Sequence, residues 1–186
     1  MEKEKRETIE AFLEGDISLS EALETEDKCL WDFDLGIPGS IEVNCTPINN
    51  EYEFYINWYD KEFGVTDDDV GAYVETMEEM GFEDAGMTGG CPIESEVFIC
   101  QKCKKEYNPS DVSDEEWEKL WDTEKCPECG GKLVYECVYE HVHLEGSKTV
   151  KIPKTEIKKL IKESKTIMDF TAKLLEKLGF EEVTLR

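Results

Sequence analysis

The chain has 186 residues, which is enough for one ordinary domain or for a domain that carries a small metal module. Its formal net charge is −24, and residues 1–99 hold 27 acidic but only 5 basic side chains. Such a surface repels phosphate groups, which excludes the N-terminal half as a direct nucleic-acid binder and favours a basic protein partner, although a merely solubilising role is the simpler alternative.

The first elements of the chain are predicted to be two short helices and an antiparallel hairpin. Residues 5–13 suit a helix, and Ser18 with Glu21 forms the capping-box pattern that begins a second one. Residues 41–46 and 51–59 alternate between apolar and polar side chains, which is the period of half-buried strands. We therefore expect a hairpin with one aromatic-rich face.

A third helix and a glycine-rich segment are expected next. Thr66 can cap the helix, and the aspartates of residues 67–69 suit the positive end of its dipole better than a calcium loop. Gly81 is an apt left-handed end for this helix. Residues 85–92 are rich in glycine and read as a flexible linker, with a reactive Cys91 as the alternative.

Two cysteine pairs form the strongest motif of the sequence. Cys100 and Cys103 make one Cys-x-x-Cys pair, and Cys126 and Cys129 make the other. Thiolates three positions apart in a tight turn converge on one point, so two pairs supply four soft ligands and close a tetrahedral metal site. Disulfides are the weaker alternative, because the charged opening of the chain shows no secretory signal. Four other cysteines are scattered singly, and most of them are expected to be buried small apolar residues: Cys29, Cys45, Cys91 and Cys137.

The residues around the pairs resemble those of zinc ribbons and rubredoxins over residues 98–135. The first pair is followed by a Tyr107-Asn-Pro turn, and the second has the form Cys-Pro-x-Cys-Gly. The resemblance implies a ribbon of strand, knuckle, loop, knuckle and strand, with Zn²⁺ or, as in rubredoxins, Fe at its centre. Rubredoxins carry glycine directly after the first pair, whereas this chain has Lys104, and this departure favours structural zinc.

A helix is predicted between the two pairs. Ser113 and Glu116 form a capping box, and the helix that follows places Trp117 and Trp121 on one face. We expect both indoles to pack on the metal site and the neighbouring strands, and an aromatic patch for a partner is the alternative.

A long strand over residues 132–144 is predicted after the second pair. It places Cys137, Tyr139, His141 and His143 on one face. Two histidines on a strand face can chelate a metal, so a second site is conceivable. We expect instead that they bind no metal and have surface or hydrogen-bonding roles, because a pair without a firm third ligand is a weak site.

The C-terminal part is predicted to be one helix from Pro153 to Leu178, followed by a short strand at residues 182–185. Its first half holds the main concentration of basic residues in the chain: Lys154, Lys158, Lys159, Lys162 and Lys165. These lysines suit an acidic partner, a nucleic acid, or the acidic half of the same chain.

Together these elements predict an α+β fold with an antiparallel sheet, several helices and an inserted zinc-ribbon module. We expect an acidic region at 1–90, the ribbon with its return strand at 91–150, and the C-terminal helix and strand at 151–186. No apolar run approaches the ~18 residues of a membrane span, and a cytoplasmic, reducing compartment fits the paired cysteines best.

Three functions are compatible with this sequence. The first is an adaptor or interaction protein that works in a larger assembly, with Zn²⁺ bound by the four paired cysteines. The second is a rubredoxin-like redox protein, and the third is an acidic mimic of nucleic acid that inhibits a basic partner. The sequence contains no recognisable catalytic residues, so an enzyme is the less favoured class.

Overall fold

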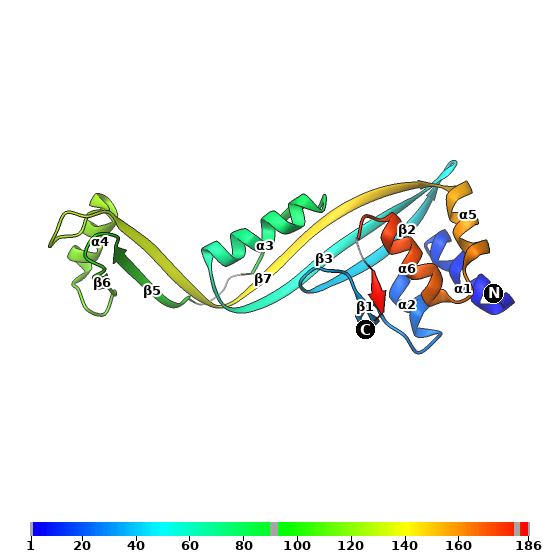
Figure 1. Cartoon of the computed structure of the whole chain (residues 1–186), viewed down its shortest axis with the longest axis horizontal. Coiled ribbons are helices and arrows are strands. Elements are labelled where there is room, and N and C mark those ends of the chain that lie inside the picture. The colour runs from blue at the N-terminus through cyan, green and yellow to red at the C-terminus, as the bar shows by residue number, and fades with distance from the viewer. Residues whose placement is uncertain (1, 90–92, 181–182, 186) are drawn as a thin grey trace. The chain divides into compact units, whose positions relative to one another are not determined.

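The computed structural model describes residues 2–89, 93–180 and 183–185, and they form an α+β fold, as predicted. The helices are α1 (Lys3–Glu14), α2 (Leu19–Glu24), α3 (Asp67–Glu79), α4 (Asp114–Thr123), α5 (Lys154–Glu163) and α6 (Ile167–Lys177), with the 3-10 helix η1 (Leu30–Asp32) (Figure 1). The strands are β1 (Phe33–Asp34), β2 (Ser40–Ile48), β3 (Glu51–Thr66), β4 (Glu83–Met87), β5 (Ile93–Cys100), β6 (Glu106–Tyr107), β7 (Leu133–Pro153) and β8 (Thr184–Leu185).

The predicted antiparallel sheet is present and has six strands. Its order is β2-β3-β7-β5-β6, and β4 also pairs with β7. A separate two-stranded sheet pairs β1 with β8. The chain divides into two compact units: unit 1 comprises residues 1–60, 73–86 and 144–186, and unit 2 comprises residues 61–72 and 87–143.

The N-terminal helices of unit 1 follow the sequence prediction and pack on β2. The Ser18 hydroxyl accepts a hydrogen bond from the Glu21 amide at 3.2 Å, and the Glu21 carboxylate accepts one from the Ser18 amide at 2.7 Å. Helix α1 ends at Gly15 with φ of +83°, where a Cβ would lie 2.8 Å from the Cys45 carbonyl oxygen. Only glycine therefore lets the end of α1 approach the strand so closely.

The predicted hairpin is β2 and β3, and it forms the core of unit 1. The strands pair antiparallel from Ser40 opposite Tyr59 to Ile48 opposite Glu51. Phe54, Ile56 and Trp58 are fully buried on the aromatic-rich face. The buried indole of Trp58 satisfies its N–H by donating to the Pro38 carbonyl oxygen at 2.9 Å.

The prediction of one continuous C-terminal helix is wrong, because α5 and α6 are separated at residues 164–166. Ser164 has extended backbone angles, and its hydroxyl donates to the Leu160 carbonyl oxygen at 2.6 Å. The Thr166 hydroxyl accepts a hydrogen bond from the Asp169 amide at 3.0 Å and so caps α6. The Glu26 carboxylate accepts two further amides of the first turn of α6, at 3.1 and 3.3 Å. These hydrogen bonds at the N-terminus of α6 therefore favour the start of a new helix over continuation of α5.

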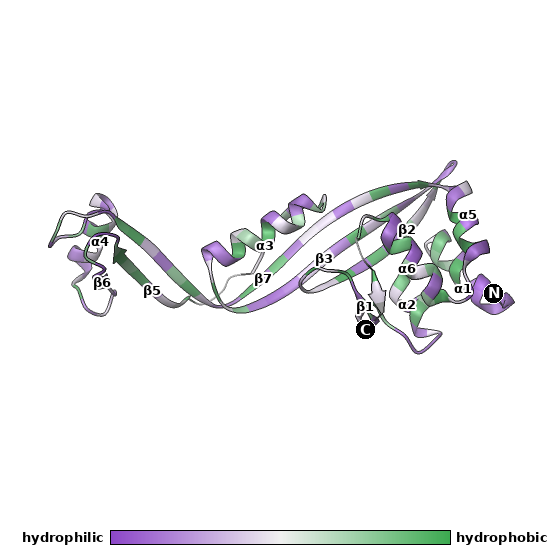
Figure 2. Cartoon of the chain, in the orientation of Figure 1, coloured by the Kyte–Doolittle hydropathy of each residue, from purple (hydrophilic) through white to green (hydrophobic). Residues whose placement is uncertain are grey.

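Strand β7 is longer than the predicted strand, and in unit 1 its buried and exposed residues alternate, with Val150 half-buried in the inner series. Leu144, Gly146, Lys148 and Ile152 all lie on the inner face. A Cβ on Gly146 would lie 3.2 Å from the Ala85 backbone, so glycine permits β4 to lie close. The Lys148 ammonium group donates to the Met80 carbonyl oxygen at 3.1 Å and lies over the rings of Phe82 and Phe180. Figure 2 shows the alternation of hydrophobic and hydrophilic residues along β7.

Unit 2 contains the expected helix between the cysteine pairs. Helix α4 begins after Ser113, whose hydroxyl accepts from the Glu116 amide while the Glu116 carboxylate accepts from the Ser113 amide. Strand β5 pairs antiparallel with both β6 and β7. Strand β4 extends to Met87 and so includes the first residues of the predicted linker at 85–92, and Cys91 lies outside the described residues.

Candidate metal centre

The first cysteine pair lies in a tight turn at the end of β5. The Lys104 amide donates to the Cys100 carbonyl oxygen at 2.9 Å, and the Cys100 amide donates to the Lys105 carbonyl oxygen at 2.9 Å. Lys104 closes the turn with φ of +62°, the left-handed conformation that glycine would adopt most easily. The Cys103 amide points at the Cys100 sulfur at 3.5 Å. The turn thereby directs both thiols to the same point.

The second pair repeats this backbone arrangement. The Gly130 amide donates to the Cys126 carbonyl oxygen at 2.9 Å, and the Cys126 amide donates to the Gly131 carbonyl oxygen at 2.8 Å. Gly130 has φ of +67° and occupies the position of Lys104 in the first turn. The Gln101 amide donates to the Lys132 carbonyl oxygen at 2.9 Å and joins the two turns. Each turn is thus a knuckle, and the two knuckles face one another.

The structure brings all four predicted ligand residues together. The sulfur atoms of Cys100, Cys103, Cys126 and Cys129 lie within 4.8 Å of one another. The Cys100 and Cys129 sulfurs are 3.5 Å apart, and the Cys103 and Cys126 sulfurs are 3.7 Å apart. Bonds of ~2.3 Å in a tetrahedral site give sulfur–sulfur edges of about 3.8 Å, so these separations fit a metal ion, whereas a disulfide requires about 2.05 Å.

Glycine at position 131 leaves the room that two of the sulfurs need. A Cβ there would lie 3.0 Å from the Cys100 sulfur, 3.2 Å from the Cys129 sulfur and 2.7 Å from the Lys102 Cβ. These distances are shorter than the usual ~3.5–4.0 Å between non-bonded carbon atoms. The cavity around the sulfurs therefore fits the four thiols closely, and a soft-metal donor set such as this one suits Zn²⁺ or Fe.

A buried tyrosine supports the second knuckle. The Tyr107 hydroxyl lies 3.0 Å from the Cys126 sulfur, and Tyr107 is held by β6, which pairs with β5. In the absence of a metal this hydrogen bond, together with weaker ones from the Glu128 and Cys129 backbone, outweighs burial and lowers the pKa of the Cys126 thiol to about 6. Burial raises the pKa of Tyr107, so the phenol stays protonated and can donate to a thiolate.

An aromatic cluster packs beside the centre, as predicted for the two tryptophans. Phe98 lies 5.1 Å from Trp117 and 4.8 Å from Trp121, measured between ring centroids. Trp121 also packs at a tilt against Tyr135 of β7, with ring centroids 4.5 Å apart. Phe98 is buried together with Leu120, Cys100 and Cys126. Trp121, in contrast, is 47% exposed. The centre therefore has a small apolar core with an aromatic edge open to solvent.

A groove of about 820 Å³ opens next to the second knuckle. It is lined by α4 and by both knuckle segments, with Tyr107, Leu120 and Pro127 among the apolar residues. Lys105 and Glu128 form an ion pair at its rim. No sequence motif predicts this groove, because its walls come from three separate segments.

The face of β7 on which the sequence predicts Cys137, Tyr139, His141 and His143 makes hydrogen bonds and a contact between rings. The Asp67 carboxylate accepts hydrogen bonds from the Cys137 thiol at 3.0 Å and from the Tyr139 hydroxyl at 2.7 Å. The rings of His141 and His143 are 5.4 Å apart. Within residues 2–89, 93–180 and 183–185, only the four paired cysteines form a group of three or more candidate ligands. The metal-free role of the histidines remains a prediction.

The scattered cysteines are not all buried. Cys45 and Cys137 are buried, as expected, and burial raises the pKa of the Cys45 thiol to about 12. Cys29 is exposed and directly precedes the short helix η1, so burial holds for two of the three scattered cysteines that the structure describes. Its thiol lines a small pocket in unit 1.

Comparisons with protein-family models, with curated proteins and with solved structures found no match to this chain. Among the described residues, no helix combines the length and the apolar character that crossing a bilayer requires.

Proposed function

We propose that the chain binds one Zn²⁺ ion through Cys100, Cys103, Cys126 and Cys129, and that it acts as an interaction protein in a larger assembly. The observation that carries the proposal is the convergence of four sulfurs from two matching knuckles. Four thiolates complete a tetrahedral zinc site and leave no position for a reacting water, so the ion has a structural role. Thiolates persist in a reducing compartment, and the proposal therefore includes a cytoplasmic location.

The features around the centre support an interaction role. The exposed edge of the aromatic cluster and the groove beside α4 lie on the same small unit as the knuckles. Aromatic side chains at the surface are typical of protein–protein contacts. The net charge of −24 favours a basic partner and its rapid, charge-guided association.

Metal analysis of protein purified without added metal tests the first part. We expect one zinc per chain, and a Cys103→Ser variant should lose it. Cys29→Ser is the matched control, because this exposed thiol lies outside the sulfur cluster and should not change the metal content. A metal content that is equally unaffected by both changes would contradict the assignment.

A redox role with Fe is the second candidate, and hydrogen bonds to the sulfurs favour it. The Tyr107 hydroxyl and the Cys103 amide both reach sulfur atoms, and such contacts tune the potential of iron–thiolate centres. Optical spectra distinguish the candidates, because a zinc centre is colourless and has no reversible potential. A red protein with a reversible one-electron couple would support the redox role and displace the zinc proposal.

Capture of partners from the native source tests the interaction role. We expect a recovered complex to weaken as salt rises, because exposed charges are screened over about 8 Å at physiological ionic strength. If the acidic surface serves instead as a mimic of nucleic acid, then DNA should compete for the captured partner. A chain that remains free of partners at low salt would contradict the interaction role.

A further inference from the structure

We propose that the pocket around Trp31 in unit 1 binds one apolar side chain of a partner segment whose flanking residues are lysine or arginine. This inference rests on the proposed interaction role and assigns a place and a chemistry to it. It concerns the segment from Ser20 to Glu42 rather than the metal centre.

Trp31 is presented to solvent by the residues around it. Leu30 and Phe33 are buried, so the short helix η1 turns the intervening indole outward, where it is 61% exposed. The Asp32 carboxylate fixes this turn by accepting a hydrogen bond from the Cys29 amide at 2.9 Å. The exposed indole is thus held on an ordered surface, and pre-organised tryptophans are typical binding hot spots.

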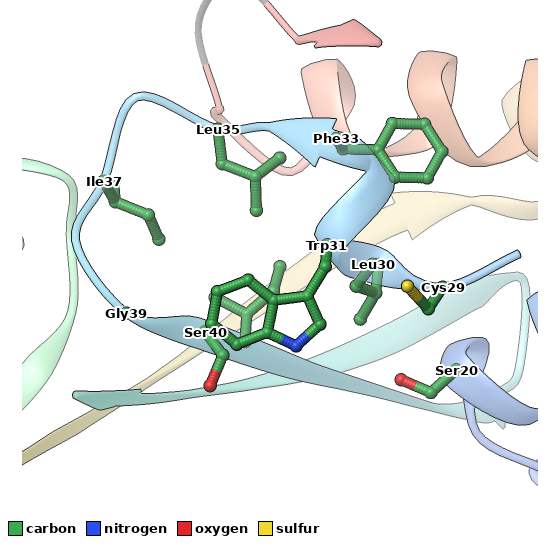
Figure 3. A pocket seen from close by; sticks show the side chains of 10 residues that line it. Ser20, Cys29, Leu30, Trp31, Phe33, Leu35, Ile37, Gly39 and Ser40 are labelled. Atoms are coloured by element: carbon green, nitrogen blue, oxygen red, sulfur yellow. The ribbon is translucent and has the colours of Figure 1, made fainter. Parts of the chain in front are cut away.

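A pocket of about 190 Å³ lies beside the indole. Its apolar wall residues include Leu30, Leu35, Ile37 and Ile41, and Ser20 and Ser40 add polar groups to the lining. In Figure 3 the indole lies across the pocket, and Leu35 and Ile37 point toward it from the loop before β2. The Cys29 thiol and the Ser20 hydroxyl lie at one side. This size suits one side chain of a partner rather than a larger ligand.

The charge of the surrounding segment selects the partner. Residues 21–42 contain seven carboxylates and a single lysine. Five of these carboxylate residues are exposed: Glu21, Glu24, Asp27, Asp34 and Glu42. A pocket whose apolar side chains come from such an acidic segment attracts a cationic partner and repels acidic ones. A nucleic acid carries the wrong charge for this site, and a second copy of this chain is repelled by its net charge of −24.

Binding of short labelled peptides to the full chain tests the inference. The probe is a peptide with one leucine between lysines, and the matched peptides replace the leucine with alanine or the lysines with glutamate. We expect the leucine–lysine peptide to bind, and Trp31→Ala to weaken its binding about thirtyfold, which is the effect of a hot-spot residue. Trp121→Ala is the matched control, since it removes an exposed indole from unit 2, and it should leave the affinity unchanged.

A second readout needs no variant. Cys29 is exposed at the pocket, so the bound peptide should slow its alkylation by iodoacetamide, as followed by mass spectrometry of the Cys29 fragment. Unchanged alkylation at a saturating peptide concentration would overturn the inference, as would equal binding of the leucine and alanine peptides. Equal affinities of the Trp31→Ala and Trp121→Ala variants would overturn it as well.

The native complex separates failure of this inference from failure of the proposed function. If Trp31→Ala still recovers the complex whereas Trp121→Ala loses it, the pocket is not the docking site and the interaction role stands. If wild type recovers no complex and binds no peptide, both fail. Loss of both the complex and the peptide in Trp31→Ala alone supports the pocket.

Discussion

Replacement of Gly131 by alanine should disturb the metal centre directly. The added methyl group would lie 2.7 Å from the Lys102 Cβ and 3.0 Å from the Cys100 sulfur. Normal contact distances then require shifts of about 0.5–0.8 Å, and overpacking of this kind costs about 1–3 kcal/mol. The backbone cannot easily move away, because the Gly131 carbonyl oxygen accepts the Cys126 amide at 2.8 Å.

The shift should appear in the affinity and in the geometry of the bound metal. Perturbation of groups around a metal site typically lowers affinity 10–100-fold, which is about 1.4–2.8 kcal/mol. Competition with a chromophoric chelator measures the affinity for Zn²⁺. The absorption spectrum of the Co²⁺-substituted protein reports how far the four sulfurs depart from a tetrahedron.

Gly130→Ala is the matched control for this change. Gly130 has φ of +67°, and a Cβ there would meet no atom within 4 Å. Alanine at this position bears a backbone strain of about 1–2 kcal/mol but touches no sulfur. Lys104 occupies the same position of the first knuckle with φ of +62°, so a side chain is tolerated there. Similar losses of affinity and identical Co²⁺ spectra in the two variants would refute the steric reasoning.

Three further changes test other parts of the structure. Cys126→Ser should remove hydrogen-exchange protection from residues 98–135 while unit 1 keeps its own, because the apolar cluster of unit 2 is small; loss of protection throughout the chain would contradict this. Glu26→Ala should lower the free energy of unfolding by about 1–3 kcal/mol in urea titrations, since two amides at the start of α6 lose their acceptor. Burial lowers the pKa of Lys148 below its usual 10.5, so the unfolded chain binds more protons in the window below 10.5, and stability should rise with pH there. Lys148→Met should reduce that rise in denaturation midpoints measured between about pH 8 and 9.5, before tyrosine ionisation contributes.

Local signals in the sequence predicted the local structure well. The capping boxes at Ser18 and Ser113, the hairpin, and the tight turn within each cysteine pair all depend on residues close together in the chain. Such features are set by backbone hydrogen bonds within one turn or by adjacent strands.

The errors arose where distant residues decide the outcome. The break between α5 and α6 has a local sign, the Thr166 cap, but it is reinforced by Glu26 from the other end of the chain. The alternation of apolar and polar residues does not predict the full length of β7, because Gly146 and Lys148 occupy buried positions that normally hold apolar residues. The contacts of Asp67 with Cys137 and Tyr139 likewise join distant segments. No periodicity can reveal such pairings.

The metal centre and the remainder of the fold rest on different sources of stability. Unit 1 buries Phe12, Phe54, Trp58 and Phe170 completely, and so large an apolar core needs no ion. Around the knuckles the buried residues are few, and two of them, Cys100 and Cys126, belong to the sulfur cluster itself. Binding of a metal there would supply much of the energy that orders the knuckles. Metal loss should therefore loosen the aromatic edge around Trp121 and leave the Trp31 pocket intact, so the two exposed indoles report separately on the two units.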